Sequence, residues 1–193
     1  MRVTLNEENQ AIWQRYNFEY LRYKYKLAPD DAVIDIGAYR GEWAAEIFRR
    51  YGCKLIVIEP GPWIVGFPHG EVINKAAGVK DGAQKFGGAY YYTSAFEDGD
   101  QEYETFDINS LLEKYDEIAL AKMNVEGSEY QLLERIYNGG HMKRIRNLQV
   151  QFHLIEGQDC AMRYEVISEL LNETHSLTWR YPFVWENWRR DVG

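Results

Sequence analysis

The chain has 193 residues, of which 46% are hydrophobic and 27% charged, values typical of a globular protein. This length predicts a single domain over residues 1–193. The formal net charge of −8 argues against nucleic acid as a partner, because such a protein needs a basic surface to neutralise phosphates. No apolar run approaches the ~20 residues that span a membrane, and no signal-peptide profile is visible, so we expect a cytoplasmic protein without a membrane partner.

The first predicted element is a long helix. Residues 7–26 contain neither Gly nor Pro, which predicts a leading amphipathic helix within residues 1–28. Its large apolar side chains at helical spacing are Trp13, Tyr16, Tyr20 and Leu21. We expect this stripe to pack against the domain; the alternative is a wall of a substrate pocket.

A strand, a glycine turn and a helix then follow in immediate succession. Residues 32–36 form an apolar run that predicts a strand, and Gly37 and Gly41 mark the turn after it. Residues 42–51 have the pattern of a helix, with Gly52 at the position of a C-terminal cap. Such a unit can hold a nucleoside-bearing cofactor, because glycines let the backbone approach the ligand closely.

The second strand of this unit is predicted at residues 54–58 and ends in Glu59 and Pro60. An acid at this position reaches the ribose hydroxyls of a bound nucleoside. The turn reads Asp-x-Gly-x-x-x-Gly, whereas dinucleotide sites have Gly-x-Gly-x-x-Gly. Its acid, Asp35, would repel a pyrophosphate and attract a cation, and S-adenosylmethionine carries both a sulfonium and an ammonium group.

These features predict S-adenosylmethionine as the cofactor. Asp35 and the backbone from Gly37 through Ala38 to Gly41 would hold its methionine portion, and Glu59 with Pro60 would hold its ribose. The alternative is a tight turn without a ligand, which Asp35 merely caps.

The middle of the chain is predicted less sharply. Residues 60–70 contain three prolines and three glycines and predict a loop or a broken helix beside the adenosine. Residues 71–77 predict a third strand, and residues 83–107 predict a hairpin or a mobile loop. A short helix is expected from Asn109 or Ser110, with a capping box that begins at Ser110.

A second motif lies further on, where an apolar run feeds a polar cluster that contains Asn124, Glu126 and Gly127. Ser128 has the spacing of a capping box and predicts the start of a helix there. Residues 147–153 alternate apolar and polar side chains and predict a strand that ends in His153.

Because ligands bind beyond the carboxyl ends of parallel strands, we expect Asp35, Glu59, Asn124, Glu126 and His153 to face one crevice. His153 is the predicted general base, since an unperturbed pKa of ~6.5 suits proton abstraction near neutral pH. Glu126 would orient that histidine or bind the acceptor. The alternatives are that His153 is a polar residue satisfied at a strand end and that Glu126 caps the next helix.

The C-terminal part, residues 156–193, predicts a helix over residues 161–172 and then one or two edge strands. The apolar face of that helix is formed by Val166, Ile167, Leu170 and Leu171. The tail over residues 176–190 is rich in Trp and Arg, and Pro182 limits any strand there to an edge. We expect these aromatics to pack the sheet; a site for a sugar or an anionic group is the alternative.

The motifs at residues 33–41, 57–60, 120–129 and 150–153 together resemble the FkbM family of S-adenosylmethionine-dependent methyltransferases. The resemblance covers residues 30–155, the expected cofactor-binding core. It implies an α/β, Rossmann-like class I methyltransferase fold, with a mostly parallel central sheet and helices on both faces. It also implies methyl transfer to a hydroxyl oxygen of a sugar, a glycan or a small natural product.

The chain departs from the family at Asn124, where aspartate is usual. Asn lacks the charge of a metal ligand or a general base, so we expect no metal in the site. A non-catalytic Rossmann-like binding protein is therefore one alternative function, and a nicotinamide-dependent oxidoreductase is another. The oligomeric state is left open.

Overall fold

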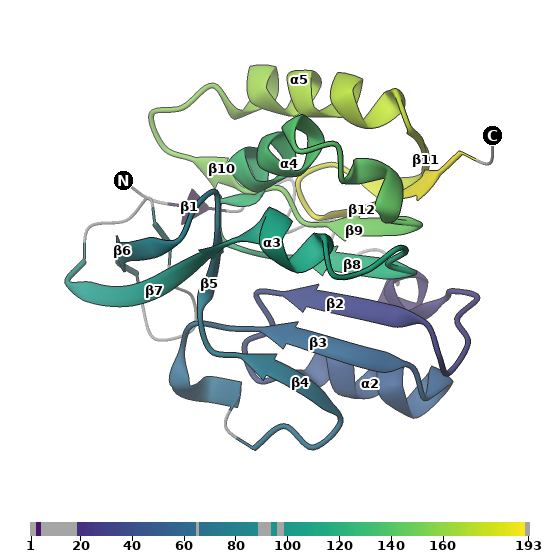
Figure 1. The fold of residues 1–193 in the computed structure, drawn as a ribbon. Coiled ribbons are helices and arrows are strands. Elements are labelled where there is room, and N and C mark those ends of the chain that lie inside the picture. The colour runs from purple at the N-terminus through teal and green to yellow at the C-terminus, as the bar shows by residue number, and fades with distance from the viewer. Residues whose placement is uncertain (1–2, 5–18, 65, 89–93, 96–98, 192–193) are drawn as a thin grey trace.

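The computed structural model describes residues 3–4, 19–64, 66–88, 94–95 and 99–191 (Figure 1). Its centre is a seven-stranded sheet in the order β11-β12-β9-β8-β2-β3-β4. The strands are β2 (Ala32–Ile36), β3 (Lys54–Ile58), β4 (Gly70–Ile73), β8 (Leu120–Met123), β9 (Asn147–Val150), β11 (His175–Tyr181) and β12 (Trp185–Arg190). The pairs among β4, β3, β2, β8 and β9 are parallel, and β12 pairs antiparallel with both β9 and β11. The predicted fold class, a mostly parallel α/β sheet, is confirmed.

Helices cover both faces of this sheet (Figure 1). The helices are α2 (Glu42–Tyr51), α3 (Ile108–Leu112), α4 (Glu129–Asn138) and α5 (Cys160–Asn172). Alternate side chains of β2 point to opposite faces, so Ile34 packs in the cluster with α3, α4 and α5, whereas Val33 packs in the cluster with α2. The strands are therefore apolar on both faces, as expected for a covered parallel sheet.

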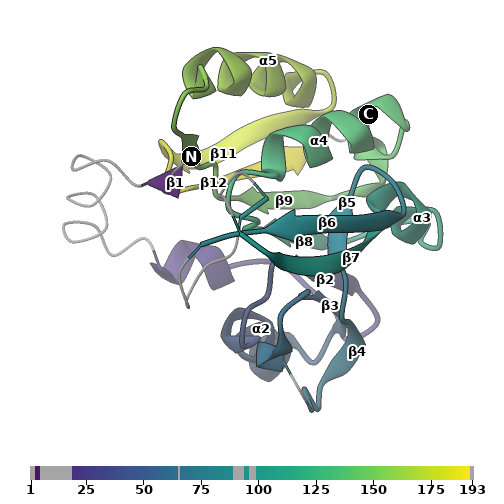
Figure 2. The same cartoon turned by 90° about the vertical axis from the view of Figure 1, so that its left-hand side faces the viewer.

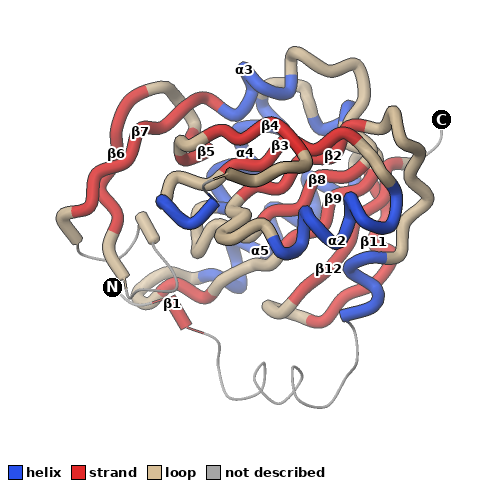
Figure 3. The backbone as a smooth tube through the Cα atoms, turned by 90° about the horizontal axis from the view of Figure 1, so that it is seen from below, coloured by secondary structure: helices blue, strands red, loops and turns tan. Residues whose placement is uncertain are grey.

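Two small sheets lie outside the main one. β6 (Gly82–Phe86) and β7 (Gln101–Asp107) form an antiparallel hairpin, and β5 (Ala76–Gly78) pairs parallel with β7. β1 (Val3–Thr4) pairs with β10 (Leu154–Ile155). The β6–β7 hairpin crosses the edge to which the parallel strands point and extends beyond it (Figures 2 and 3). It therefore forms part of the surface above the carboxyl ends of those strands.

The strand, helix and strand predicted at residues 32–36, 42–51 and 54–58 have the predicted bounds. Gly52 adopts a left-handed conformation at φ 65°, and its N–H donates to the carbonyl of Phe48, as a C-terminal cap does. Three short 3-10 turns complete the described elements: η1 (Glu19–Tyr23), η2 (Pro62–Ile64) and η3 (Met142–Arg144).

Several predicted elements differ in the structure. The strand predicted at residues 71–77 is divided between β4 and β5, which belong to different sheets. The cap of α3 is Asp107, whose carboxylate accepts from the Asn109 N–H, so the capping box predicted at Ser110 is wrong. Ser128 does stand at the start of α4, but its side chain makes no capping bond.

The two ends of the chain also differ from the predictions. Residues 5–18 of the predicted leading helix lie outside the described residues, and its last part is only the turn η1, in which Tyr20 is 55% exposed. In α5, Val166 is 46% exposed and so does not share the buried face predicted for it.

The aromatic tail packs the sheet, as expected, because Trp185 and Trp188 are both buried. β11 is an edge strand, but β12 lies between β11 and β9, so the prediction of edge strands holds for β11 alone. None of the helices in the described part of the chain is long and apolar enough to cross a membrane.

Candidate functional site

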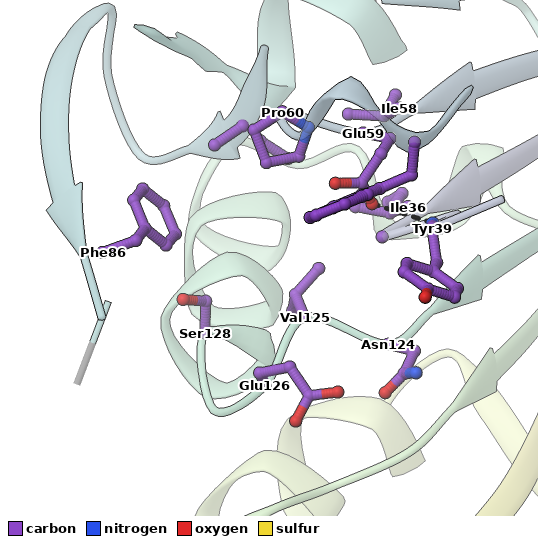
Figure 4. Close-up of a pocket in the computed structure, with 14 residues that line it drawn as sticks. Ile36, Tyr39, Ile58, Glu59, Pro60, Phe86, Asn124, Val125, Glu126 and Ser128 are labelled. Carbon is purple, nitrogen blue, oxygen red and sulfur yellow. Dashed lines mark hydrogen bonds between the residues drawn. The ribbon is translucent and has the colours of Figure 1, made fainter. Parts of the chain in front are cut away.

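A pocket opens at the carboxyl ends of β2, β3 and β8, where the sequence predicts the cofactor crevice (Figure 4). Five residues predicted for the site line this pocket: Gly37, Glu59, Pro60, Asn124 and Glu126. The predicted residues Asp35, Ala38, Gly41 and His153 are not among its lining residues. The remaining lining includes the aromatic rings of Tyr39, Trp63 and Phe86.

Gly37 follows β2 and lies against the backbone of Asn124, which follows β8. Its φ is +75°, and a Cβ atom built on it would stand 1.8 Å from the carbonyl oxygen of Asn124. The Asn124 N–H donates to the carbonyl of Ile36 at 3.0 Å, which holds the ends of the two strands together. Glycine is required here both for the backbone conformation and for the close contact.

Asp35 lies beneath this turn and is fully buried. Lys122 occupies the paired position on β8, and its Nζ lies 2.9 Å from Asp35 Oδ1 and donates to the Gly37 carbonyl at 2.7 Å. The carboxylate oxygens of Asp35 accept no hydrogen bond, and the ion pair with Lys122 is the interaction that balances their charge. The predicted direct attraction between Asp35 and a cationic cofactor therefore needs correction, because Lys122 already neutralises Asp35.

Glu59 follows β3 and directs its carboxylate into the pocket (Figure 4). Oε2 accepts from the Tyr39 N–H and Oε1 from the Gly61 N–H, each at 2.8 Å. Burial raises the pKa of Glu59, and these two hydrogen bonds oppose that effect. A carboxylate has about four lone-pair sites, so each oxygen keeps a site for a further donor. Two adjacent hydroxyl groups match this arrangement.

Aromatic rings flank Glu59. The rings of Tyr39 and Trp63 lie 5.9 Å apart at 51°, and both line the pocket. Tyr39 has φ 53°, a conformation that is uncommon for residues other than glycine and concentrates at functional sites. Tyr39 thus supplies both a hydrogen bond to Glu59 and a flat apolar surface.

Glu126, which is partly exposed, forms a network with the buried side chains of His153 and Glu129. Glu129 Oε1 accepts from the His153 backbone N–H at 2.6 Å and lies 2.9 Å from His153 Nδ1. His153 Nε2 lies 3.3 Å from Glu126 Oε2. Glu126 lines the pocket, whereas Glu129 is fully buried beneath it.

The predicted role of His153 as a general base needs correction. Burial lowers the pKa of this imidazole, but the charges of Glu129 and Glu126 raise it more strongly, to about 9. Both of its nitrogens face carboxylates, which favours the protonated ring near neutral pH. Such a ring cannot accept a proton from a substrate.

The site residues predicted from the sequence include neither Lys122 nor Glu129, and Glu129 is expected at the helix start, facing away from the site. Both stand in the motif that contains Asn124 and Glu126, and both are polar residues at buried positions, which is the only signal they give. Among the residues that the structure describes, no group of three or more His, Cys, Asp or Glu side chains could hold a metal ion. Cys53 and Cys160 are free and buried.

Several solved structures with a similar fold are named as methyltransferases. The 23S rRNA methyltransferase ErmE matches with a TM-score of 0.50 and 12% identity over 92% of this chain and 68% of its own. A geranyl diphosphate methyltransferase in complex with sinefungin has a TM-score of 0.41 and 13% identity, over 79% of this chain and 50% of its own. The 1,6-didemethyltoxoflavin-N1-methyltransferase of Burkholderia thailandensis, with bound S-adenosylhomocysteine, has a TM-score of 0.43 and 10% identity, over 96% and 83%. No protein-family model matches the sequence, and no curated protein matches it.

At sequence identities this low, structural similarity establishes the fold and nothing about function. The strand order and the antiparallel hairpin at one end of the sheet are those of class I S-adenosylmethionine-dependent methyltransferases. Numbered along the chain and read from β4, the strands of this sheet have the order 3-2-1-4-5-7-6. A doubly wound dinucleotide-binding sheet has the order 3-2-1-4-5-6 and so differs at the end that here carries β12 and β11. The chain thus has the class I methyltransferase fold, with a pocket at the edge of the sheet where this architecture binds its ligands.

Proposed function

We propose that the protein is an S-adenosylmethionine-dependent methyltransferase that acts on a hydroxyl oxygen of a sugar, a glycan or a small natural product. The observation that carries the cofactor assignment is Glu59, a buried carboxylate that two backbone N–H groups fix at the end of β3. The oxygen acceptor rests on the resemblance of residues 120–129 and 150–153 to the FkbM family.

The residues present fit this cofactor. Glu59 has acceptor capacity for the two hydroxyls of a ribose, and Tyr39 and Trp63 offer flat surfaces to an adenine. The buried Oδ1 of Asn124 has no hydrogen-bond partner and is suited to an ammonium group. When bound, S-adenosylmethionine supplies a sulfonium-activated methyl group for transfer to a nucleophilic oxygen. We propose that no metal takes part.

Calorimetric titration of the purified protein tests the cofactor assignment. We expect S-adenosylmethionine to bind and NADH not to bind. Glu59→Gln removes the charge and sets an amide N–H against a backbone N–H, so affinity should fall about 10- to 100-fold. Glu102→Gln, at an exposed position of β7, is the matched control and should leave the affinity unchanged.

Other outcomes have distinct meanings. Binding of NADH alone would support an oxidoreductase, and binding of neither compound would support a non-catalytic protein with this fold. Unchanged affinity in Glu59→Gln would refute the placement of the ribose. If the cofactor binds, methyl transfer from radiolabelled S-adenosylmethionine to a panel of hydroxylated sugars tests the acceptor class.

A further inference from the structure

We propose that Glu126 is the acceptor-binding residue of this pocket and that His153 and Glu129 position it there as a carboxylate. The group that approaches Glu126 is then a hydrogen-bond donor without negative charge, either an alcohol hydroxyl or a protonated amine. This inference rests on the proposed function, because the acceptor is the second substrate of a methyltransferase.

The donors and acceptors of the network fix its protonation. Glu129 Oε2 accepts from the Gly127 N–H at 3.0 Å, and Oε1 accepts from the His153 N–H. Since Glu129 acts as an acceptor, His153 Nδ1 must donate to it. His153 Nε2 faces a second carboxylate, with Glu126 Oε2 at 3.3 Å, an ion-pair distance for a protonated ring. The contacts of both ring nitrogens with carboxylates therefore favour an imidazolium that holds Glu126.

The backbone of Glu126 is also fixed in place. Its φ is 50°, a left-handed conformation that is strained in a residue with a side chain. Ser94 is fully buried, and its hydroxyl donates to the Glu126 carbonyl at 2.6 Å. Ser94 itself is fixed by two backbone hydrogen bonds with Gly87, at the end of the β6–β7 hairpin. Contacts from the hairpin and from His153 thus hold one strained residue at the pocket.

The charges at this end of the pocket select the acceptor. Glu126 and Glu129 carry two negative charges, and His153 carries one positive charge, so one negative charge remains. The side chains of Asn124 and Glu126 point toward one another (Figure 4), and the buried Oδ1 of Asn124 has no hydrogen-bond partner. No lining residue in the described part of the chain is Lys or Arg. The net negative charge at Glu126 favours a hydrogen-bond donor and repels an anion.

The protonation of His153 can be measured in the free protein. Nitrogen NMR of the imidazole should show both nitrogens protonated near neutral pH, and Glu126→Gln should lower the midpoint of its titration. His175 is an internal control in the same spectra, because burial lowers its pKa. A neutral His153 ring near neutral pH, or a midpoint that Glu126→Gln leaves unchanged, would overturn the proposed network.

Acceptor selection can be tested with three hexoses of different charge. Methyl glucoside, glucosamine and glucuronate are titrated separately while amide shifts of residues 124–128 are followed. We expect the neutral and cationic sugars to bind at least about tenfold more tightly than glucuronate, and Glu126→Gln to remove this preference. Binding of glucuronate with equal affinity, or no shift with either of the other two sugars, would overturn the assignment.

The affinity for the cofactor shows whether Glu126 binds the acceptor or the cofactor. Glu126→Gln should leave the affinity for S-adenosylhomocysteine unchanged, and a loss of about tenfold or more would assign Glu126 to the cofactor and overturn this inference. If the unsubstituted protein binds no S-adenosylmethionine while the sugars bind as expected, the proposed function fails and the charge selection by Glu126 stands.

Discussion

The substitution Gly37→Ala tests how closely the two central strands must approach. A left-handed φ costs an L-residue about 1–2 kcal/mol, and Gly37 has φ +75°. The added Cβ would also stand 1.8 Å from the Asn124 carbonyl oxygen, and overpacking of this kind typically costs about 1–3 kcal/mol. We therefore expect the free energy of unfolding to fall by about 2–5 kcal/mol.

A matched control separates these two contributions. Gly52 also has a positive φ, +65°, but no atom lies within 4 Å of a Cβ built on it. Gly52→Ala should therefore cost only the conformational part, about 1–2 kcal/mol. Urea unfolding of both variants gives the comparison, and calorimetry should show weaker S-adenosylmethionine binding only in Gly37→Ala. Equal losses of stability in the two variants would refute the close contact as the reason for glycine at this position.

Two further predictions concern buried charges. Lys122→Met leaves Asp35 buried without a counter-charge and should lower the free energy of unfolding in urea by about 3–5 kcal/mol. Adding Asp35→Leu to this variant should recover most of the loss, and no recovery would contradict the pairing. Burial raises the pKa of Glu186 from 4.5 to about 7. The folded state therefore favours the protonated carboxyl group, and the protein loses stability as the pH rises from 4.5 to about 7. Relative to the unsubstituted protein, Glu186→Gln should gain up to about 3 kcal/mol across that window, and a constant difference would contradict the shift.

The elements that sequence alone predicts well are those with local signals. The unit formed by β2, α2 and β3 is one example. Its strands are apolar runs, and Gly52 marks the end of its helix. The run at residues 71–77 contains no such mark, yet the chain leaves the main sheet inside it. Which sheet a strand joins depends on its pairing partner, and that partner is distant in sequence.

The same distinction applies to the site. Strand order predicts that Glu59, Asn124 and Glu126 reach one pocket, and they do. The partner of Asp35 could not be predicted, because Lys122 becomes its neighbour only when β8 pairs with β2. The role of His153 also depended on unpredicted structure: β9 ends at Val150, and the chain beyond it turns the ring between Glu126 and Glu129.

The pocket is lined by residues from two parts of the chain, the parallel sheet and the stretch that contains the β6–β7 hairpin. Gly37, Glu59 and Asn124 follow the strands of the parallel sheet, whereas Ala77 and Phe86 come from the stretch between β4 and β8. That stretch pairs within its own small sheet and leaves the main strand ladder intact. Substitutions in that stretch can therefore change the lining of the pocket without breaking a hydrogen bond of the main sheet.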